Sequence, residues 1–394
     1  MYTLPGTCIP PGVECFLSFR LRATFSVFLS CFFLMEELSV QTLSQVGTEL
    51  GMYDVGVQAL CDRGVQKIPD KYIIPEHDRP CAGNVVSTGH IPVIDMSKVH
   101  GVERAKVLQQ MRCACEEWGV FQLINHDFPE NSMQSMMEIA HQFFELPAET
   151  KMQYYCSNPS SATRYGISYN AEKEKRFDWR DFLFQPCHPL SDELVSTWPD
   201  VPPSYREIAR KYAMNIRTLA LRLLAMLSES LGLYGEYLAY ALKEHEQKML
   251  INHYPPCPQP DLTLGVSGHT DPNIITVLQQ DEVGGLQVLR DGLWVAVHPI
   301  RNAFVINMGD QMQIISNGKY QCVEHRAVVN SARTRFSIAS FYGPSLDAII
   351  CPAPQLIDQD HPPQYHEVIY GDYLKAFRAK GPNKKAYLQS VLIK

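Results

Sequence analysis

Residues 274–307 read IITVLQQDEVGGLQVLRDGLWVAVHPIRNAFVIN, in which short apolar or β-branched runs alternate with turn-forming residues such as Asp291-Gly292. Beyond Asn317-Gly318, two further runs of this kind occupy 327–330 and 336–341. Asp-Gly and Asn-Gly are typical of type I′ turns in β-hairpins, and several short strands at regular spacing are typical of sandwiches and barrels. The sequence therefore predicts a mainly β core, a distorted double-stranded β-helix or jelly roll.

The part of the chain before this region has a different character. Apolar residues recur at helical spacing in four segments, 101–118, 132–146, 205–233 and 236–246. Residues 157–190 carry many polar residues and turn formers, so a long loop region is expected there. We thus expect helices to flank the β core, with a mixed helical N-terminal part.

The chain has 394 residues. At about 150 residues per domain, this length corresponds to two or three domains or to one large domain. Four parts are expected along the chain. They are a poorly defined N-terminal extension (1–55), an N-terminal region of arm, helices and short strands (56–200), a helical connection (201–246) and a jelly-roll domain with a C-terminal tail (247–394).

An apolar run in the N-terminal extension bears on location. Its charge-free part, 23–34, is shorter than the roughly 20 residues that cross a bilayer. Arg20 and Arg22 precede it, as in a signal or transit segment, but no clear small-x-small cleavage site follows. We interpret the run as a non-essential extension, with targeting as the alternative, and expect a cytoplasmic protein without a stable membrane anchor.

Composition restricts the expected partners. Lysine and arginine total 35 against 42 aspartate and glutamate, a net charge of −7, and no long basic run occurs, so nucleic-acid binding is not expected. The twelve cysteines contain no C-x-x-C pair, which argues against zinc-ribbon and thioredoxin-type sites and favours buried free thiols. We expect a small-molecule partner and a monomer.

Five polar residues in the β region form a candidate reactive site. His269 and Asp271 are two residues apart and can converge on one point, and His325 follows later in the chain. Two histidines and one carboxylate form the facial triad of non-haem Fe(II) oxygenases. Arg335 and Ser337 form a second pair on one strand face, where a guanidinium can bind a carboxylate. An isolated H-x-D or R-x-S is usually structural, but the ordered set within one predicted jelly roll indicates a site.

The chain resembles the plant 2-oxoglutarate- and Fe(II)-dependent dioxygenases, which include flavonoid oxygenases and hormone-modifying hydroxylases. The resemblance runs from Ile91 to the C-terminus and includes the arm from Gly64 to Pro80. It is carried by Ile91-Pro92-Val93-Ile94-Asp95, Trp118-Gly119-Val120-Phe121, Asn252-His253-Tyr254-Pro255-Pro256-Cys257-Pro258, Gly268-His269-Thr270-Asp271-Pro272, Asn307-Met308-Gly309-Asp310, His325-Arg326-Ala327-Val328 and Arg335-Phe336-Ser337.

This resemblance implies a role for each candidate residue. The His-Asp-His set would ligate Fe(II), and Arg335 and Ser337 would hold the distal carboxylate of 2-oxoglutarate. Asn252 and Tyr254 match family positions beside this cosubstrate. The implied reaction consumes O2 and 2-oxoglutarate, yields succinate and CO2, and is supported by ascorbate. A zinc hydrolase would use the same three ligands but would leave the Arg-x-Ser pair unexplained.

The substrate is the least constrained expectation. Resemblance to flavonoid-type members places Tyr165 and Phe341 near it, and Phe341 is suited to stacking on a planar ring. Leu250 and Gly343 stand where some flavonoid oxidases have a lysine and an acid.

The stretch 177–182 is most similar to the downy-mildew-resistance-type subgroup, whose members act on salicylate and whose relatives are flavone synthases. We therefore expect hydroxylation or desaturation of a small aromatic or phenolic metabolite such as salicylate or a flavanone. A gibberellin-like diterpenoid acid is the alternative substrate, and a non-catalytic jelly-roll binding protein is the alternative from another class.

Overall fold

The computed structural model describes residues 56–80, 85–86, 90–156, 162–168, 176–380 and 385–393. The expectations for residues 1–55, including the apolar run, lie outside the described residues. All described residues belong to one compact unit, Gly56–Lys394.

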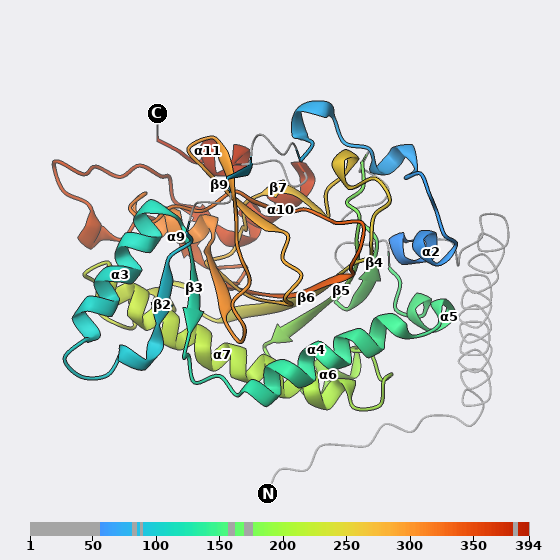
Figure 1. The fold of residues 1–394 in the computed structure, drawn as a ribbon. Helices are drawn as coiled ribbons and strands as arrows, with labels where there is room; N and C mark the ends of the chain where they lie inside the picture. The colour runs from blue at the N-terminus through green and yellow to red at the C-terminus, as the bar shows by residue number, and fades with distance from the viewer. Residues whose placement is uncertain are drawn as a thin grey trace, which may run out of the picture. The chain divides into compact units, whose positions relative to one another are not determined.

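Two sheets form the centre of this unit (Figure 1). The larger has the order β2-β3-β11-β8-β13-β6-β5-β4 and the smaller β1-β10-β9-β12-β7. In these orders, the strands are β2 (Val93–Asp95), β3 (Val120–Ile124), β11 (Phe304–Met308), β8 (Ile275–Gln280), β13 (Arg335–Pro344), β6 (His245–Tyr254), β5 (Asp181–His188) and β4 (Arg164–Gly166), then β1 (Val85–Val86), β10 (Leu293–Ala296), β9 (Leu286–Arg290), β12 (His325–Ala327) and β7 (Val266–His269). The two strands β14 (Ile349–Ile350) and β15 (Val368–Ile369) pair separately.

One apolar cluster contains side chains from both sheets. Val277 and Leu278 are neighbours on β8, but only Leu278 belongs to this cluster, because successive side chains of a strand point to opposite faces. The small sheet contributes Leu286 and Val288 from β9. The predicted jelly-roll core with flanking helices is confirmed.

Three long helices cover the other face of the larger sheet. They are α3 (Arg104–Glu117), α4 (Glu130–Glu145) and α7 (Tyr205–Ser230), and Figure 1 shows α4 and α7 side by side beneath the strands. The shorter helices are α2 (Val57–Asp62), α5 (Ala148–Met152), α6 (Asp192–Ser196), α8 (Tyr237–Ala241), α9 (Asp310–Ile315), α10 (Tyr370–Lys380) and α11 (Ala386–Ser390). Single 3₁₀ turns occur at η2 (Asp70–Tyr72), η3 (Glu76–Asp78), η5 (Met96–Lys98), η6 (Pro260–Leu262) and η7 (Pro354–Leu356).

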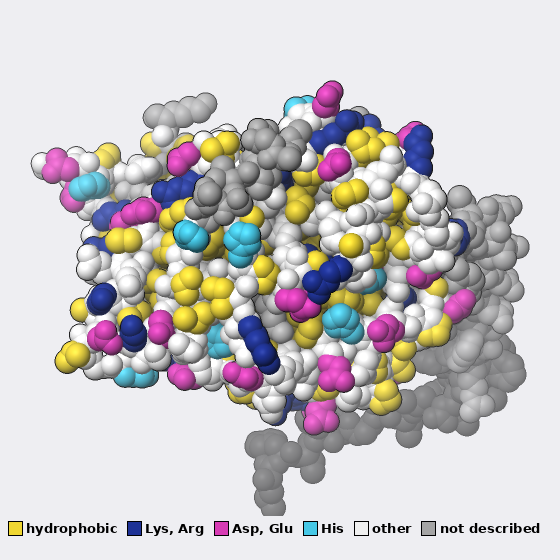
Figure 2. All heavy atoms as spheres, in the orientation of Figure 1, with side chains coloured by type: hydrophobic (Ala, Val, Ile, Leu, Met, Phe, Trp, Pro, Cys, Tyr) yellow, Lys and Arg dark blue, Asp and Glu magenta, His cyan; other side chains and the backbone are white. Residues whose placement is uncertain are grey.

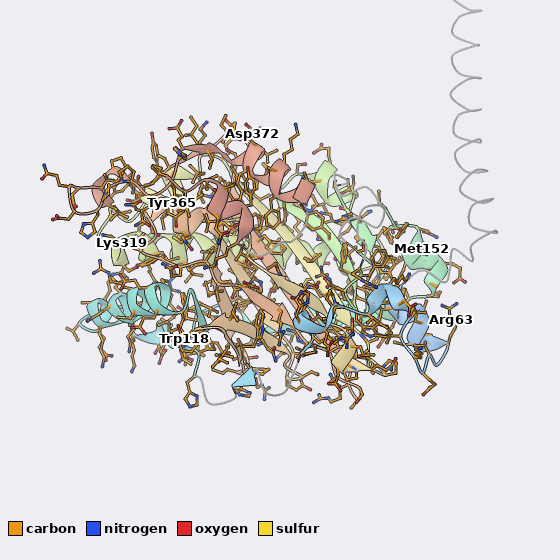
Figure 3. All side chains as sticks on the ribbon, turned by 90° about the horizontal axis from the view of Figure 1, so that it is seen from above. Arg63, Trp118, Met152, Lys319, Tyr365 and Asp372 are labelled. Atoms are coloured by element: carbon orange, nitrogen blue, oxygen red, sulfur yellow. The ribbon has the colours of Figure 1, made fainter. Side chains whose placement is uncertain are left out.

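Residues 56–80 form an arm that packs on the segment leading into β5. The buried carboxylate of Asp181 accepts hydrogen bonds from the backbone N–H groups of Val57 (2.8 Å) and Gln58 (3.0 Å), at the start of α2. Further along the arm, the ring of Tyr72 meets that of Trp179 edge-on, with centroids 5.1 Å apart. In Figure 3, Arg63 on the arm and Asp372 on α10 lie in separate regions around the strands.

Two expectations about secondary structure are wrong. The region 157–190, expected to be a loop, contains the eight-residue strand β5, in which Gln185 and Pro186 obscure the strand pattern. The helix expected over 236–246 is limited to α8, and the last residues of that range already belong to β6. Charged residues such as Glu246 and Lys248 concealed β6, although it lies in the middle of the larger sheet.

The two turn dipeptides have different outcomes. Asp291 and Gly292 have φ values of 51° and 78° and join β9 to β10, so the type I′ hairpin is confirmed. Asn317 and Gly318 also have positive φ values, 52° and 79°, but they follow α9 and join no hairpin. The expectation of a hairpin there is wrong, because a left-handed pair can equally well end a helix.

Two observations describe the surface. Among the described residues, no helix combines the length and the apolar character needed to cross a membrane. On the face drawn in Figure 2, acidic and basic side chains are interspersed with apolar ones.

Candidate functional site

The small sheet and the loop after β7 bring two histidines and an aspartate together. His269, the last residue of β7, lies directly opposite His325, the first residue of β12, and their ring centroids are 4.3 Å apart. Asp271 follows β7, and its Oδ1 is 3.7 Å from Nε2 of His269 and 3.8 Å from Nε2 of His325. One ligand atom from each residue therefore faces a common point, and all three atoms lie within 4.8 Å of one another.

Backbone carbonyls orient both imidazoles. Nδ1 of His269 is 2.9 Å from the carbonyl oxygen of Ser267, and Nδ1 of His325 is 3.1 Å from that of Val323. Because a carbonyl oxygen only accepts, Nδ1 carries the proton in each ring and the Nε2 lone pair is free. This arrangement is usual for histidines that bind a metal.

The carboxylate of Asp271 is fixed in a similar way. The hydroxyl of Thr276 donates to Oδ2 at 2.6 Å, which leaves Oδ1 facing the histidines. The backbone N–H of Asp310 donates to the Asp271 carbonyl at 2.8 Å. Gly309 makes this approach possible, because a Cβ at that position would lie 2.1 Å from the carbonyl oxygen of Asn273.

The three side chains have the chemistry of a divalent-metal site. Burial first, and then the neighbouring His325, lower the pKa of His269 to about 4, so this imidazole is neutral at pH 7. Neutral imidazoles and one buried carboxylate are the donor set of the 2-His-1-carboxylate triad. These residues fit Fe(II).

Arg335, the first residue of β13 in the larger sheet, places a buried guanidinium in the cavity that His269, Asp271 and His325 also line. Arg335 is 2% exposed, and its Nη2 donates to Oε1 of Gln280 at 3.1 Å. Its Nε and Nη1 have no hydrogen-bond partner among the described residues. Its plane lies over the ring of Tyr254, 4.9 Å from the centroid. Unpaired buried donors are costly, so this cation fits a carboxylate ligand.

The side chains next to Arg335 extend the polar surface. Ser337 lies two residues along β13, and its hydroxyl accepts a hydrogen bond from Nδ2 of Asn252 at 3.3 Å. Asn252 pairs with Ser337 across the β13–β6 ladder. The residues expected to hold the distal carboxylate of 2-oxoglutarate thus form one contiguous group.

One cavity is lined both by the two histidines and the aspartate and by the polar group around Arg335, which are His269, Asp271, His325, Arg335, Ser337, Asn252 and Tyr254. The rest of its wall is mainly apolar, with two polar side chains besides Thr276. These other wall residues are Arg180, Leu250, Val266, Leu278, Leu286, Asn307, Ala327, Ala339 and Phe341.

Eight of the nine site residues predicted from the sequence line this cavity. The expected metal and cosubstrate residues and Phe341 line this cavity, but Tyr165 does not. Tyr165 faces the opposite side of β4 from Arg164, where it packs against Phe143 and Phe144 and donates to Oδ2 of Asp181 at 3.2 Å. The strand alternation that sets this direction could not be predicted without β4 and β5.

Two of the cavity residues that were not predicted, Thr276 and Arg180, hydrogen-bond to predicted site residues. Thr276 lies on a predicted strand, but its contact with Asp271 depends on a turn that the sequence does not specify. Arg180 lies in the stretch that drew attention by its resemblance. Its Nη1 donates to Oδ1 of Asn252 at 2.6 Å. The sequence feature that could have indicated a site residue is a charged side chain between the aromatic residues Trp179 and Phe182.

Comparison with family models gives two matches. Residues 245–344 match the 2OG-Fe(II) oxygenase superfamily. Residues 91–204 match the N-terminal region described as non-haem dioxygenase in morphine synthesis.

Known proteins similar to the chain include plant oxygenases. Protein DMR6-LIKE OXYGENASE 2 of Arabidopsis thaliana is 46% identical over 79% of this chain and 90% of its own length. Flavanone 3-dioxygenase 2 of Oryza sativa subsp. japonica is 44% identical over 82% and 93%, respectively. The crystal structure of JOX2 in complex with 2OG, Fe and JA is similar with a TM-score of 0.78 and 35% identity, over 86% of this chain and 98% of that one.

Proposed function

Since the chain belongs to the 2OG-Fe(II) oxygenase superfamily and is an Fe(II)/2-oxoglutarate-dependent dioxygenase, we propose that His269, Asp271 and His325 hold its iron. The observation that supports this assignment is the convergence of one atom from each residue within 4.8 Å. When bound, Fe(II) supplies the oxidation of a substrate C–H bond by O2, coupled to the conversion of 2-oxoglutarate to succinate and CO2.

We further propose that Arg335 and Ser337 bind the distal carboxylate of 2-oxoglutarate. The two unpaired nitrogens of Arg335 can donate to it, and the Ser337 hydroxyl offers a third donor. Asn252 and Tyr254 keep this pair in place, through the amide contact with Ser337 and the ring beneath Arg335. These side chains position the cosubstrate and exclude water from it.

For the substrate, we propose a small aromatic or phenolic metabolite such as salicylate or a flavanone. The cavity wall beside Arg335 and Ser337 is apolar, because Leu250, Leu278 and Ala339 line it. Phe341 offers a ring for stacking. The names of the similar oxygenases support the same class. A gibberellin-like diterpenoid acid is the second candidate, because an apolar wall also accepts a fused aliphatic ring system.

Mass spectrometry tests this proposal. The purified protein with Fe(II), ascorbate and 2-oxoglutarate is offered salicylate, flavanones, coumarins and gibberellin precursors, and succinate and altered substrate are both measured. We expect an aromatic substrate to gain one oxygen or lose two hydrogens, with succinate formed. A product from a gibberellin precursor alone would overturn the aromatic class. No succinate from iron-loaded protein would favour a non-catalytic binding protein.

We also propose that the protein works as a cytoplasmic monomer and that 247–394 is its catalytic domain, with 56–200 and 201–246 as supporting region and connection. The free thiols expected from the cysteine positions support this location, because a reducing compartment keeps cysteines unpaired. Light scattering after size-exclusion chromatography tests the oligomeric state, and a stable dimer would contradict it.

A further inference from the structure

A second guanidinium lies in the cavity and has no function in the scheme above. The Arg180 side chain is 12% exposed and lines the cavity that also contains the proposed iron ligands. A buried cation requires a compensating partner, and Arg335 already serves the one distal carboxylate of 2-oxoglutarate in the proposed scheme.

The protein neutralises Arg180 only partly. Among the described residues its guanidinium makes one hydrogen bond, the 2.6 Å contact with the neutral amide of Asn252. The nearest carboxylate, that of Asp178, is 3.9 Å away, and its other oxygen accepts hydrogen bonds from the N–H and the hydroxyl of Ser267. Since a guanidinium carries five N–H donors, Arg180 retains donors for a ligand.

The segment that carries Arg180 is firmly attached on both sides. The indole N–H of Trp179 donates to the carbonyl of Pro255 at 3.2 Å, and its backbone N–H donates to Leu264 at 2.8 Å. On the other side, Asp181 caps the start of the arm, and the Arg180 guanidinium packs over the ring of Phe182 at 5.4 Å. The guanidinium is therefore preorganised.

The order of the strands separates Arg180 from Arg335 and Ser337, the proposed binding pair for 2-oxoglutarate. Arg335 lies on β13, whereas Arg180 immediately precedes β5, and β6 runs between these strands. Asn252 of β6 stands between the two groups, since its Oδ1 accepts from Arg180 and its Nδ2 donates to Ser337. Arg180 is thus available to a second ligand beside the cosubstrate.

We infer that Arg180 binds the carboxylate of the substrate, and that the substrate is an aromatic acid whose ring packs against the apolar wall that includes Phe341. This inference rests on the proposed function and narrows its substrate class. Arginine binds a planar carboxylate with two parallel hydrogen bonds, while a neutral flavanone would leave Arg180 with only the long, 3.9 Å ion pair to Asp178.

Calorimetric titration under anaerobic conditions tests the inference on the full chain loaded with Fe(II) and 2-oxoglutarate. The probes are salicylate and its neutral amide, salicylamide. We expect the wild type to bind salicylate at least about 10-fold more tightly than salicylamide, as one charge-assisted contact allows. Arg180→Gln should weaken salicylate binding roughly 10- to 100-fold and leave salicylamide unchanged, while Arg180→Lys should retain part of the preference.

Two controls make the result specific. Arg176→Gln removes a guanidinium from the same segment and should behave as the wild type. Among the described residues, its Nη1 donates to the backbone carbonyl of Asp70. The affinity of Arg180→Gln for 2-oxoglutarate should stay within about twofold of the wild type, because Arg335 holds that ligand in the proposed scheme.

Three results would overturn the inference. They are equal wild-type affinity for acid and amide, no wild-type binding of salicylate, and weakened 2-oxoglutarate binding in Arg180→Gln, which would assign the residue to the cosubstrate. Each leaves the proposed function intact if the wild type still binds 2-oxoglutarate. A wild type that binds iron but no 2-oxoglutarate overturns both.

Discussion

His269 and His325 face each other across the antiparallel β7–β12 pair, with ring centroids 4.3 Å apart and each Nδ1 directed at a backbone carbonyl. The ladder register thus fixes the distance between the two rings, and the carbonyls fix their tautomer. Only the third ligand, Asp271, depends on a loop, and that loop is held by Thr276 and Asp310. Contacts within the protein therefore orient all three side chains.

Replacing the carboxylate ligand tests the metal assignment. Asp271→Ala should abolish both iron retention and succinate formation, because two neutral imidazoles alone bind Fe(II) weakly and leave its charge uncompensated. Elemental analysis and succinate assays measure the two effects. Asp261→Ala, at an exposed position, is the matched control. Unaltered activity in Asp271→Ala would remove the basis for the metal site.

The hydrogen bond from Thr276 to Asp271 provides a subtler test. Thr276→Val keeps the shape of the side chain but loses the 2.6 Å contact, so metal affinity should fall roughly 10- to 100-fold. Thr276→Ser keeps the hydroxyl and should restore most of the affinity. Titration with Mn(II), followed by the fall in its free-ion resonance signal, measures both variants. Equal affinities of the Val and Ser variants would show that the contact does not matter.

Much of the site could be predicted from the sequence, since its residues sit in short motifs with fixed spacing. Arg335 and Ser337 share a face because β13 is a regular strand, and most strands after residue 270 follow the apolar pattern. Strands β5 and β6 could not be predicted, because polar residues interrupt them. Without those strands, neither the direction of Tyr165, away from the cavity and into the packing against Phe143, nor the position of Arg180 beside Asn252 could be predicted.

A buried histidine should make the protein sensitive to acid. His253 packs between Phe144 and Phe336, with ring centroids 4.8 Å from each. Burial, helped by Lys151 and His141, lowers its pKa to about 3. Because the unfolded chain takes up a proton near pH 6.5 and the folded chain does not, stability is full above that pH and falls as the pH decreases towards 3.

The loss from His253 should reach about 2 kcal/mol between pH 7.5 and pH 5, at about 1.4 kcal/mol per pH unit below pH 6.5. His253→Phe removes this contribution, so its free energy of unfolding should fall less over that interval. Urea unfolding of both proteins at pH 7.5 and pH 5 measures the difference. Other buried histidines are common to both proteins and cancel. Equal losses in the two proteins would contradict the account.

The arm should depend on Asp181. Asp181→Ala leaves the N–H groups of Val57 and Gln58 without their acceptor, at a cost of about 1–3 kcal/mol for the buried donor of Val57 and less for the partly buried donor of Gln58. Limited trypsin digestion should then cut the arm near Lys67 markedly faster than in the wild type. Asp192→Ala, which breaks an exposed ion pair with Arg210, is the control. Unchanged cleavage in Asp181→Ala would mean that the aromatic contacts alone hold the arm.

The joint metal and cosubstrate site is most directly tested by titrating 2-oxoglutarate into the anaerobic Fe(II) protein. The readout is the visible charge-transfer band that develops when 2-oxoglutarate chelates iron. The wild type should saturate near one equivalent, and Arg333→Ala, which loses an exposed ion pair with Glu282, should match it. Arg335→Ala should need roughly 100-fold more 2-oxoglutarate, because it loses charge-assisted hydrogen bonds. An unshifted titration in Arg335→Ala, or no band in the iron-loaded wild type, would contradict the assignment of this site.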